Sequence, residues 1–155
     1  MKLVRILSIL VMVLGVLGIV IGGVFIGEGI AKNNLIVNRM EVEKVSLALD
    51  PNQPGVYTPI NNSSDAQKAA DTIAEHRRAI APTYQDLLGS GRFDPTNPLH
   101  LTYAQAMNLE NYLYMAVTAF GLIQVTIASG AFMVIVSLAI GATGLALYRI
   151  ARKQT

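Results

Sequence analysis

The chain of 155 residues contains no cysteine, no tryptophan and only two histidines, His76 and His100. Without thiols it can form neither disulfide bonds nor zinc–thiolate sites, and it has no cysteine nucleophile. An iron site of two histidines and one carboxylate would need both imidazoles, and nothing in their sequence contexts brings them together. We expect His76 on a solvated helix face and His100 in a loop before a helix, and we predict no metal, no cofactor and no catalytic residue.

Charged residues are also scarce, at 14% of the chain, and two long stretches carry none. One lies between Arg5 and Glu28, and the other between Glu110 and Arg149. Each exceeds the roughly 20 apolar residues that a helix needs to cross about 30 Å of hydrocarbon. The fifteen Leu, Ile, Val and Phe residues of Ile6–Ile26 favour insertion by about 5 to 9 kcal/mol. The sequence therefore predicts two membrane spans.

A cleaved signal peptide is the alternative for the first stretch, because Lys2 and Arg5 precede an apolar run. The apolar core of a signal peptide covers only about 7 to 15 residues before a small-residue cleavage site. This run is longer, and the sequence at Gly27–Ala31 is poorly suited to cleavage. The pattern therefore favours a retained anchor.

The distribution of charge predicts how the spans are oriented. All ten acidic residues lie between the two runs with seven basic residues, so the middle of the chain has a net charge of minus three. The two short ends hold five basic residues and no acidic residue: Lys2, Arg5, Arg149, Arg152 and Lys153. Because basic flanks stay in the cytoplasm, we predict that both termini are cytoplasmic. The basic pI then reflects topology and not nucleic-acid binding.

Five segments follow from these boundaries. They are a cytoplasmic N-terminus at 1–5, a transmembrane helix at 6–27, an extracytoplasmic domain at 28–110, a long second helix at 111–148 and a cytoplasmic C-terminus at 149–155. At 1.5 Å per residue, the second helix would be about 57 Å long, nearly twice the thickness of the hydrocarbon. We therefore expect only about residues 127–148 to lie in the membrane.

Shorter patterns predict the structure of the middle segment. Alternating apolar residues over 39–49 predict one or two short strands, followed by a turn-rich linker. Ser64 and Gln67 have capping-box spacing and open a helix over about 65–80. Its apolar residues recur at helical intervals: Ala66, Ala69, Ala70, Ile73 and Ile80. Thr102 and Gln105 repeat the capping-box spacing and are expected to open a helix that continues to about Ala151.

The predicted fold class is a mainly α membrane protein: a two-helix transmembrane hairpin with a small extracytoplasmic helical domain that includes short β structure. A domain of about 80 residues is close to the size at which an independent core is marginal. We therefore expect this domain to lean on the base of the second long helix, on the bilayer surface or on a partner.

Several short motifs lie between residues 43 and 121. They are Ile73-Ala74-Glu75-His76, Thr83-Tyr84-Gln85-Asp86-Leu87, Leu113 and Ala119-Phe120-Gly121, preceded by Glu43-Lys44-Val45-Ser46-Leu47. Together they resemble small two-span membrane proteins common in actinobacteria and related bacteria, some of which carry the name of a ring-opening dioxygenase. The resemblance implies a bacterial origin and the two-span topology, and it transfers no catalytic residue.

Small residues form stripes along both predicted spans. They are Gly15, Gly18, Gly22, Gly23 and Gly27 in the first and Gly130, Ser137, Gly141 and Gly144 in the second. Inside lipid, close approach of backbones is what makes helix association favourable, and small residues allow it. One stripe can join the two spans of this chain. A second glycine face on the first span predicts another contact, with a second copy or with another membrane protein.

These features lead to two hypotheses of function. The first is a non-enzymatic accessory or assembly subunit of a larger bacterial membrane complex, held by its glycine-striped helices. The alternative is a membrane-tethered binding module whose outer helices and Pro-rich linker capture an envelope component or small ligand. A pocket lined by Tyr57, Tyr84 and Tyr103 would favour this alternative. A membrane-bound enzyme ranks third, because no reactive constellation occurs in the sequence.

Overall fold

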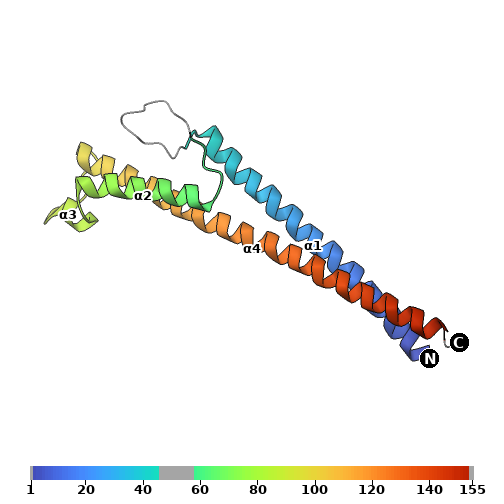
Figure 1. Ribbon diagram of the computed structural model, residues 1–155. Helices are drawn as coiled ribbons and strands as arrows, with labels where there is room; N and C mark the ends of the chain where they lie inside the picture. The colour runs from blue at the N-terminus through green and yellow to red at the C-terminus, as the bar shows by residue number, and fades with distance from the viewer. Residues whose placement is uncertain (1, 46–57, 154–155) are drawn as a thin grey trace. The chain divides into compact units, whose positions relative to one another are not determined.

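The computed structural model describes residues 2–45 and 58–153 of the chain, and these residues are mainly helical (Figure 1). The elements in order are α1 (Lys2–Val42), α2 (Ser63–Ile80), α3 (Tyr84–Leu88) and α4 (Pro98–Lys153). The predicted mainly α class is confirmed. No strand occurs within these two ranges, so the predicted β component is not supported.

The chain divides into two compact units, and α1 and α4 contribute to both. The first, which we call the hairpin unit, comprises Met1–Asn33 and Leu122–Thr155. The second, the α2 unit, comprises Asn34–Gly121 and therefore includes α2, α3, the end of α1 and the beginning of α4.

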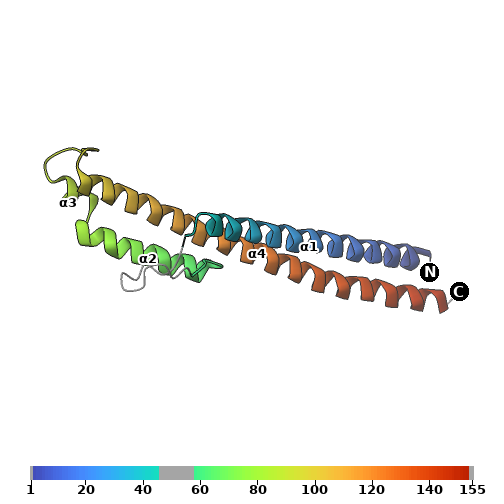
Figure 2. The same cartoon turned by 90° about the horizontal axis from the view of Figure 1, so that it is seen from above.

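In the hairpin unit, α1 and α4 run antiparallel. Gly22 faces Gly130, because a Cβ atom built on Gly22 would lie 2.7 Å from the Gly130 carbonyl oxygen. Earlier in α1, the Ser8 carbonyl oxygen lies 3.0 Å from the Cβ position of Gly144. As residue numbers increase along α1, the residues that they contact on α4 have decreasing numbers, so the two helices are antiparallel. Figures 1 and 2 both show the first turn of α1 at the same end of this unit as the last turn of α4.

Both long helices are long and apolar enough to cross a membrane. The most apolar 18-residue windows within Leu3–Val42 and Pro98–Lys153 have mean hydropathies of 3.0 and 2.2, and only 11% of each window is buried. A core helix of a soluble protein would bury most of such a window. Large apolar side chains therefore cover the surface of the hairpin unit instead of filling an interior.

The α2 unit has a conventional apolar core between α2 and α4. Its buried members are Ile60, Ala66, Ala69, Ala70, Ile73, Leu113, Ala116 and Phe120. The short alanine side chains of α2 let its backbone approach α4 closely. Four of the five apolar positions predicted for this helix are buried, and the fifth, Ile80, is half-buried.

The predicted helix starts were displaced from the observed ones. Asn62, and not Ser64, is the N-cap of α2: its side-chain oxygen accepts a hydrogen bond from the Asp65 backbone N–H at 3.0 Å. Several cap-forming residues follow one another here, so spacing alone does not select among them. The capping box predicted at Thr102 is wrong as well, because α4 already begins at Pro98. The Asn97 side chain accepts from the Leu99 N–H, and proline is well suited to the first helical position.

The strand predicted over 39–49 is wrong for its first part, where α1 continues to Val42. Ile36, Val37 and Met40 pack against the core of the α2 unit at helical spacing. This helical spacing of apolar residues extends further along the chain than the apolar alternation that predicted a strand, which covers only a few residues. The helix ends before Lys44, whose positive φ of 50° is incompatible with a continuing helix. Residues 46–49 of the predicted strand lie outside the described ranges.

Candidate functional site

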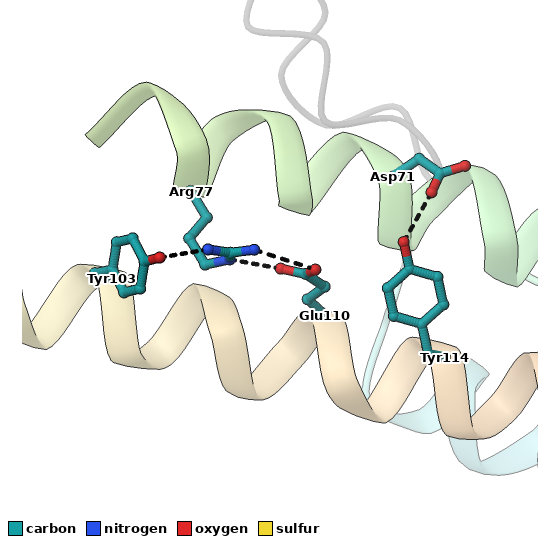
Figure 3. A network of polar contacts seen from close by, with 5 residues as sticks. All are labelled: Asp71, Arg77, Tyr103, Glu110 and Tyr114. Atoms are coloured by element: carbon teal, nitrogen blue, oxygen red, sulfur yellow. Dashed lines mark hydrogen bonds and ion pairs between the residues drawn. The ribbon is translucent and has the colours of Figure 1, made fainter. Parts of the chain in front are cut away.

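A network of polar side chains in the α2 unit joins α2 to α4 through Arg77, Tyr103 and Glu110 (Figure 3). Arg77 Nε donates to Glu110 Oε2 at 2.6 Å, and its Nη2 reaches Oε1 at 3.4 Å. Arg77 Nη1 donates to the Tyr103 hydroxyl. Tyr103 and Glu110 are seven residues apart, which places them on the same face of α4 toward α2. One guanidinium thus bridges about two turns of α4.

This network is well shielded from solvent. The side chains of Arg77 and Glu110 are 12% and 10% exposed, and Tyr103 is fully buried. The guanidinium carbon also lies 5.0 Å from the centre of the Tyr103 ring, within cation–π range. The hydrogen bond with Glu110 raises the pKa of Arg77 above its ordinary value, although burial opposes this shift. Arg77 therefore stays cationic.

A second polar contact, between Asp71 and Tyr114, ties the same two helices together (Figure 3). The Tyr114 hydroxyl and the Gln67 side-chain amide each donate to Asp71 Oδ1 at 2.9 Å. The hydrogen bond to Asp71 is the main cause that raises the pKa of Tyr114 above its ordinary value. The phenol is protonated below pH 10, so the contact is present there and is lost as the pH rises through the raised pKa.

The arrangement fastens α2 to α4. Both carboxylate oxygens of Glu110 are engaged by Arg77, and the guanidinium is shared between Glu110 and Tyr103. Within residues 2–45 and 58–153, every buried side-chain nitrogen or oxygen has a hydrogen-bond partner. The network therefore fixes the register of α2 on α4.

The two histidines lie in separate contexts. His76 is exposed on α2. His100 belongs to the first turn of α4 and not to a loop before it, as predicted, because α4 begins earlier. Its Nδ1 accepts from the Asp94 N–H at 3.0 Å, and its ring stacks on Phe93. Among the residues that the structure describes, no three His, Cys, Asp or Glu side chains form a group that could hold a metal ion.

The tyrosine pocket stays a prediction, because the described residues include two of its three tyrosines, Tyr84 and Tyr103. Tyr84 and Tyr103 have ring centres 6.2 Å apart, but Tyr103 is fully buried and hydrogen-bonded to Arg77. Tyr57 lies outside the described ranges. An apolar hollow of about 380 Å³ lies elsewhere in the α2 unit. We call it the apolar hollow, and it is lined by Arg39, Met40, Glu43, Val45, Leu109, Tyr112 and Leu113.

Seven of the nine small residues predicted for helix packing lie in the contact between α1 and α4. They are Gly15, Gly18, Gly22, Gly130, Ser137, Gly141 and Gly144. A Cβ atom on Gly15 would lie 2.8 Å from the Gly141 Cα, and one on Gly144 would lie 2.9 Å from the Met12 nitrogen. These are approaches of backbone to backbone that no larger residue allows. Gly29 extends the contact to Ile127.

The other two predicted residues, Gly23 and Gly27, face open space. Beyond the neighbouring turns of α1 itself, no described heavy atom lies within 4 Å of the Cβ position of either residue. α1 therefore carries two different glycine faces: one packed against α4, and one that no described part of the chain covers.

Comparisons of the chain with protein-family models, with curated proteins and with solved structures found no match. The resemblance to actinobacterial two-span membrane proteins therefore remains a prediction, and the function has to be argued from the residues themselves.

The predicted topology anchors lie at one end of the hairpin unit. Lys2 is the first residue of α1, with Arg5 one turn later. Arg152 and Lys153 lie in the last turn of α4, and Arg149 one turn before. The side chains of the four anchors other than Lys2 are exposed.

The tight glycine contact predicts how single methyl groups affect the hairpin. We expect Gly22→Ala to destabilise it by about 1 to 3 kcal/mol, because the new methyl group meets backbone and the helices must separate. The free energy of unfolding of the full chain, measured by SDS titration in mixed micelles, checks this.

Two controls carry the same change. Gly23→Ala meets no atom, and Gly141→Ala meets the Gly15 Cα at an ordinary 4.0 Å, so both should retain wild-type stability or gain slightly from helix propensity. Equal losses in all three variants would contradict the observed pairing of faces.

The Arg77–Glu110 pair predicts a strong coupling between two distant positions. Glu110→Leu leaves the shielded Arg77 charge without its partner and should destabilise the α2 unit by about 2 to 4 kcal/mol. Adding Arg77→Met should recover much of that loss, because an apolar pair of similar volume costs little. Urea unfolding of the full chain in detergent, followed by circular dichroism, measures both effects.

The control is the exposed neighbour Arg78. Its change to Met should shift the free energy of unfolding by less than about 0.5 kcal/mol. Additive losses in the double variant would contradict the pairing.

Proposed function

We propose that this chain is a two-span integral membrane protein of a bacterial cytoplasmic membrane, with both termini in the cytoplasm and residues 28–110 outside. In this proposal it acts without catalysis, as an accessory or assembly subunit of a larger membrane complex. The observation that carries the proposal is the pair of glycine faces on α1, one used within the chain and one uncovered.

Insertion is supported by the surface of the hairpin unit. Its most apolar windows are only 11% buried, so most of their apolar side chains need a non-aqueous surrounding.

Retention of the first span is supported by its packing. Removal of α1 as a signal peptide would expose the α4 backbone at Gly130 and Gly144, which α1 approaches closely.

The orientation is supported by charge alone. The basic residues at the two ends lie together in the antiparallel hairpin, and the acidic residues all lie between the spans. The positive-inside rule places such ends in the cytoplasm.

A role in assembly is supported by the uncovered face of α1. Gly23 and Gly27 are four residues apart, so they form a small-xxx-small pair on one side of the helix. A helix from another membrane protein could approach this face as closely as α4 approaches the first face. The absence of catalysis in the proposal rests on Arg77 and Glu110, two shielded charged groups that bind each other.

The second candidate function is a tethered binding module, and the apolar hollow favours it. That hollow, lined among others by Met40, Leu109 and Tyr112, offers almost wholly apolar walls. Apolar pockets of about 300 to 1,000 Å³ are typical of sites for small ligands. In this reading the hairpin holds the α2 unit near the membrane, where a lipophilic envelope molecule would be its ligand.

The assembly role predicts that retention of a partner depends on the uncovered glycine face. The tagged full chain is purified from native membranes in mild detergent, and partners are identified by mass spectrometry. The double variant Gly23→Leu/Gly27→Leu should lose at least tenfold in partner recovery while remaining in the membrane. The control is Gly121→Leu, because Gly121 also has open surroundings but lies outside the predicted span. This variant should recover the partner as well as the wild-type chain does.

Two outcomes would contradict the assembly role. One is a wild-type chain recovered alone under every condition. The other is a partner recovered equally with the double variant. Recovery of two differently tagged copies of this chain would identify the partner as a second copy.

A further inference from the structure

The uncovered glycine face of α1 is one part of a longer apolar stripe, which we call the open seam. Its residues follow one another at intervals of three or four positions, which keeps them on one side of the helix. Its Ile and Val side chains are between 45% and 61% exposed, and its glycines face open space. The open seam comprises Ile9, Val13, Val16, Val20, Gly23, Gly27 and Ile30.

The open seam differs in residue type from the neighbouring side of α1. It contains only β-branched residues and glycine, whereas the positions that directly follow Ile9, Val13 and Val16 are all leucine. β-branched side chains are stiff and lose little rotamer freedom when they pack, and glycine lets two backbones approach closely. The open seam therefore has the composition of a contact between helices.

The open seam also has the same repeat as the contact that α1 makes with α4. Each α1 residue in that contact directly precedes a residue of the open seam. These contact residues are Ser8, Met12, Gly15, Gly22 and Gly29. The two stripes therefore run side by side along α1. A helix that keeps one such stripe against its partner also keeps the neighbouring stripe on one side over its whole length.

An apolar hollow of about 290 Å³ joins the open seam to the α1–α4 contact. It is lined by Ile9, Met12, Val13, Val16 and Leu17. Met12 belongs to both surfaces, because its backbone nitrogen also lies 2.9 Å from the Cβ position of Gly144 in α4. A helix that packs on the open seam would thus extend an existing contact.

A second copy of the chain fits the open seam. No charged residue lies between Arg5 and Glu28, so two identical faces meet there without repulsion between like charges. Copies that insert into one membrane have the same orientation, so their α1 helices run parallel. Each residue of the seam then meets its counterpart at the same depth. A two-fold dimer uses the same patch on both copies in this way.

We propose that the open seam binds the open seam of a second copy, in a parallel pair of α1 helices related by a two-fold axis. This inference rests on the proposed membrane insertion and names the partner at the uncovered glycine face. Gly23 and Gly27 lie where the two backbones approach most closely, and Val13, Val16 and Val20 pack on either side of the axis. Each α1 then contacts its own α4 and the second α1.

The absence of native cysteines allows the open seam to be mapped by disulfide crosslinking of the full chain in native membranes. Val13→Cys and Val20→Cys place single thiols on the seam. The controls Leu14→Cys and Ile21→Cys place them one residue further along α1, at nearly the same depth. After oxidation with copper phenanthroline, the seam variants should give about tenfold more product of twice the chain's mass, because a disulfide needs Cα atoms within about 7 Å.

A second variant tests the glycine pair within the same experiment. Adding Gly27→Leu to Val20→Cys should lower the yield of this product about tenfold, because the larger side chain holds the two backbones apart. The substitution meets no other described part of the chain, since Gly27 faces open space. Adding Gly121→Leu to Val20→Cys is the control and should leave the yield unchanged.

Three results would overturn the inference: equal yields from seam and control variants, no product of twice the mass from the seam variants, or a seam product that contains a different protein. Extraction of membranes with alkaline carbonate separates this failure from a failure of the proposed function. A chain that resists extraction without crosslinking through the seam contradicts only the second copy. A chain that is extracted contradicts membrane insertion itself.

Discussion

The constraint on which the rest of the structure depends is that the hairpin unit leaves most of its large apolar side chains exposed. Leu10 is 53% exposed, and Phe132 and Ile135 are each 67% exposed. In water this surface would drive aggregation, whereas in hydrocarbon it costs nothing. The hydrophobic effect therefore cannot hold α1 against α4 within lipid. Attraction between the helices has to come from the close fit of their backbones, which explains why the contact is lined by glycine and serine.

The α2 unit, in contrast, is stabilised by a buried apolar core. It buries alanine, isoleucine and phenylalanine in a core, as a water-soluble domain does, and it encloses the Arg77–Glu110 pair between two helices. An alanine-lined helix can slide along its partner with little penalty, because its side chains are small and alike. The ion pair and the Tyr114–Asp71 hydrogen bond remove that freedom, since each is satisfied at only one register. Polar contacts thus specify the position, and apolar burial supplies the stability.

Much of the fold could be predicted from the sequence because its strongest signals are local. The two uncharged runs, the alanine spacing of α2 and the glycine stripes each depend on residues within a few turns of one another. The misses arose where local signals compete. Asn62 and Ser64 both suit a helix start, and alternation at Met40 and Val42 fits a strand as well as a helix. The Arg77–Glu110 pair joins residues 33 positions apart. A single sequence contains no signal that pairs them, although the seven-residue spacing of Tyr103 and Glu110 marks a shared face.

The central claim is that the chain crosses the membrane twice with both ends on the cytoplasmic side, and the absence of native cysteines allows a direct test. Ser90→Cys places a thiol in an exposed turn of the α2 unit, and Thr155→Cys places one at the last residue of the chain. Each variant is treated in intact cells with a membrane-impermeant maleimide. The account predicts labelling of Ser90→Cys in intact cells and labelling of Thr155→Cys only after permeabilisation. The reverse pattern, or equal labelling of both variants in intact cells, would contradict it.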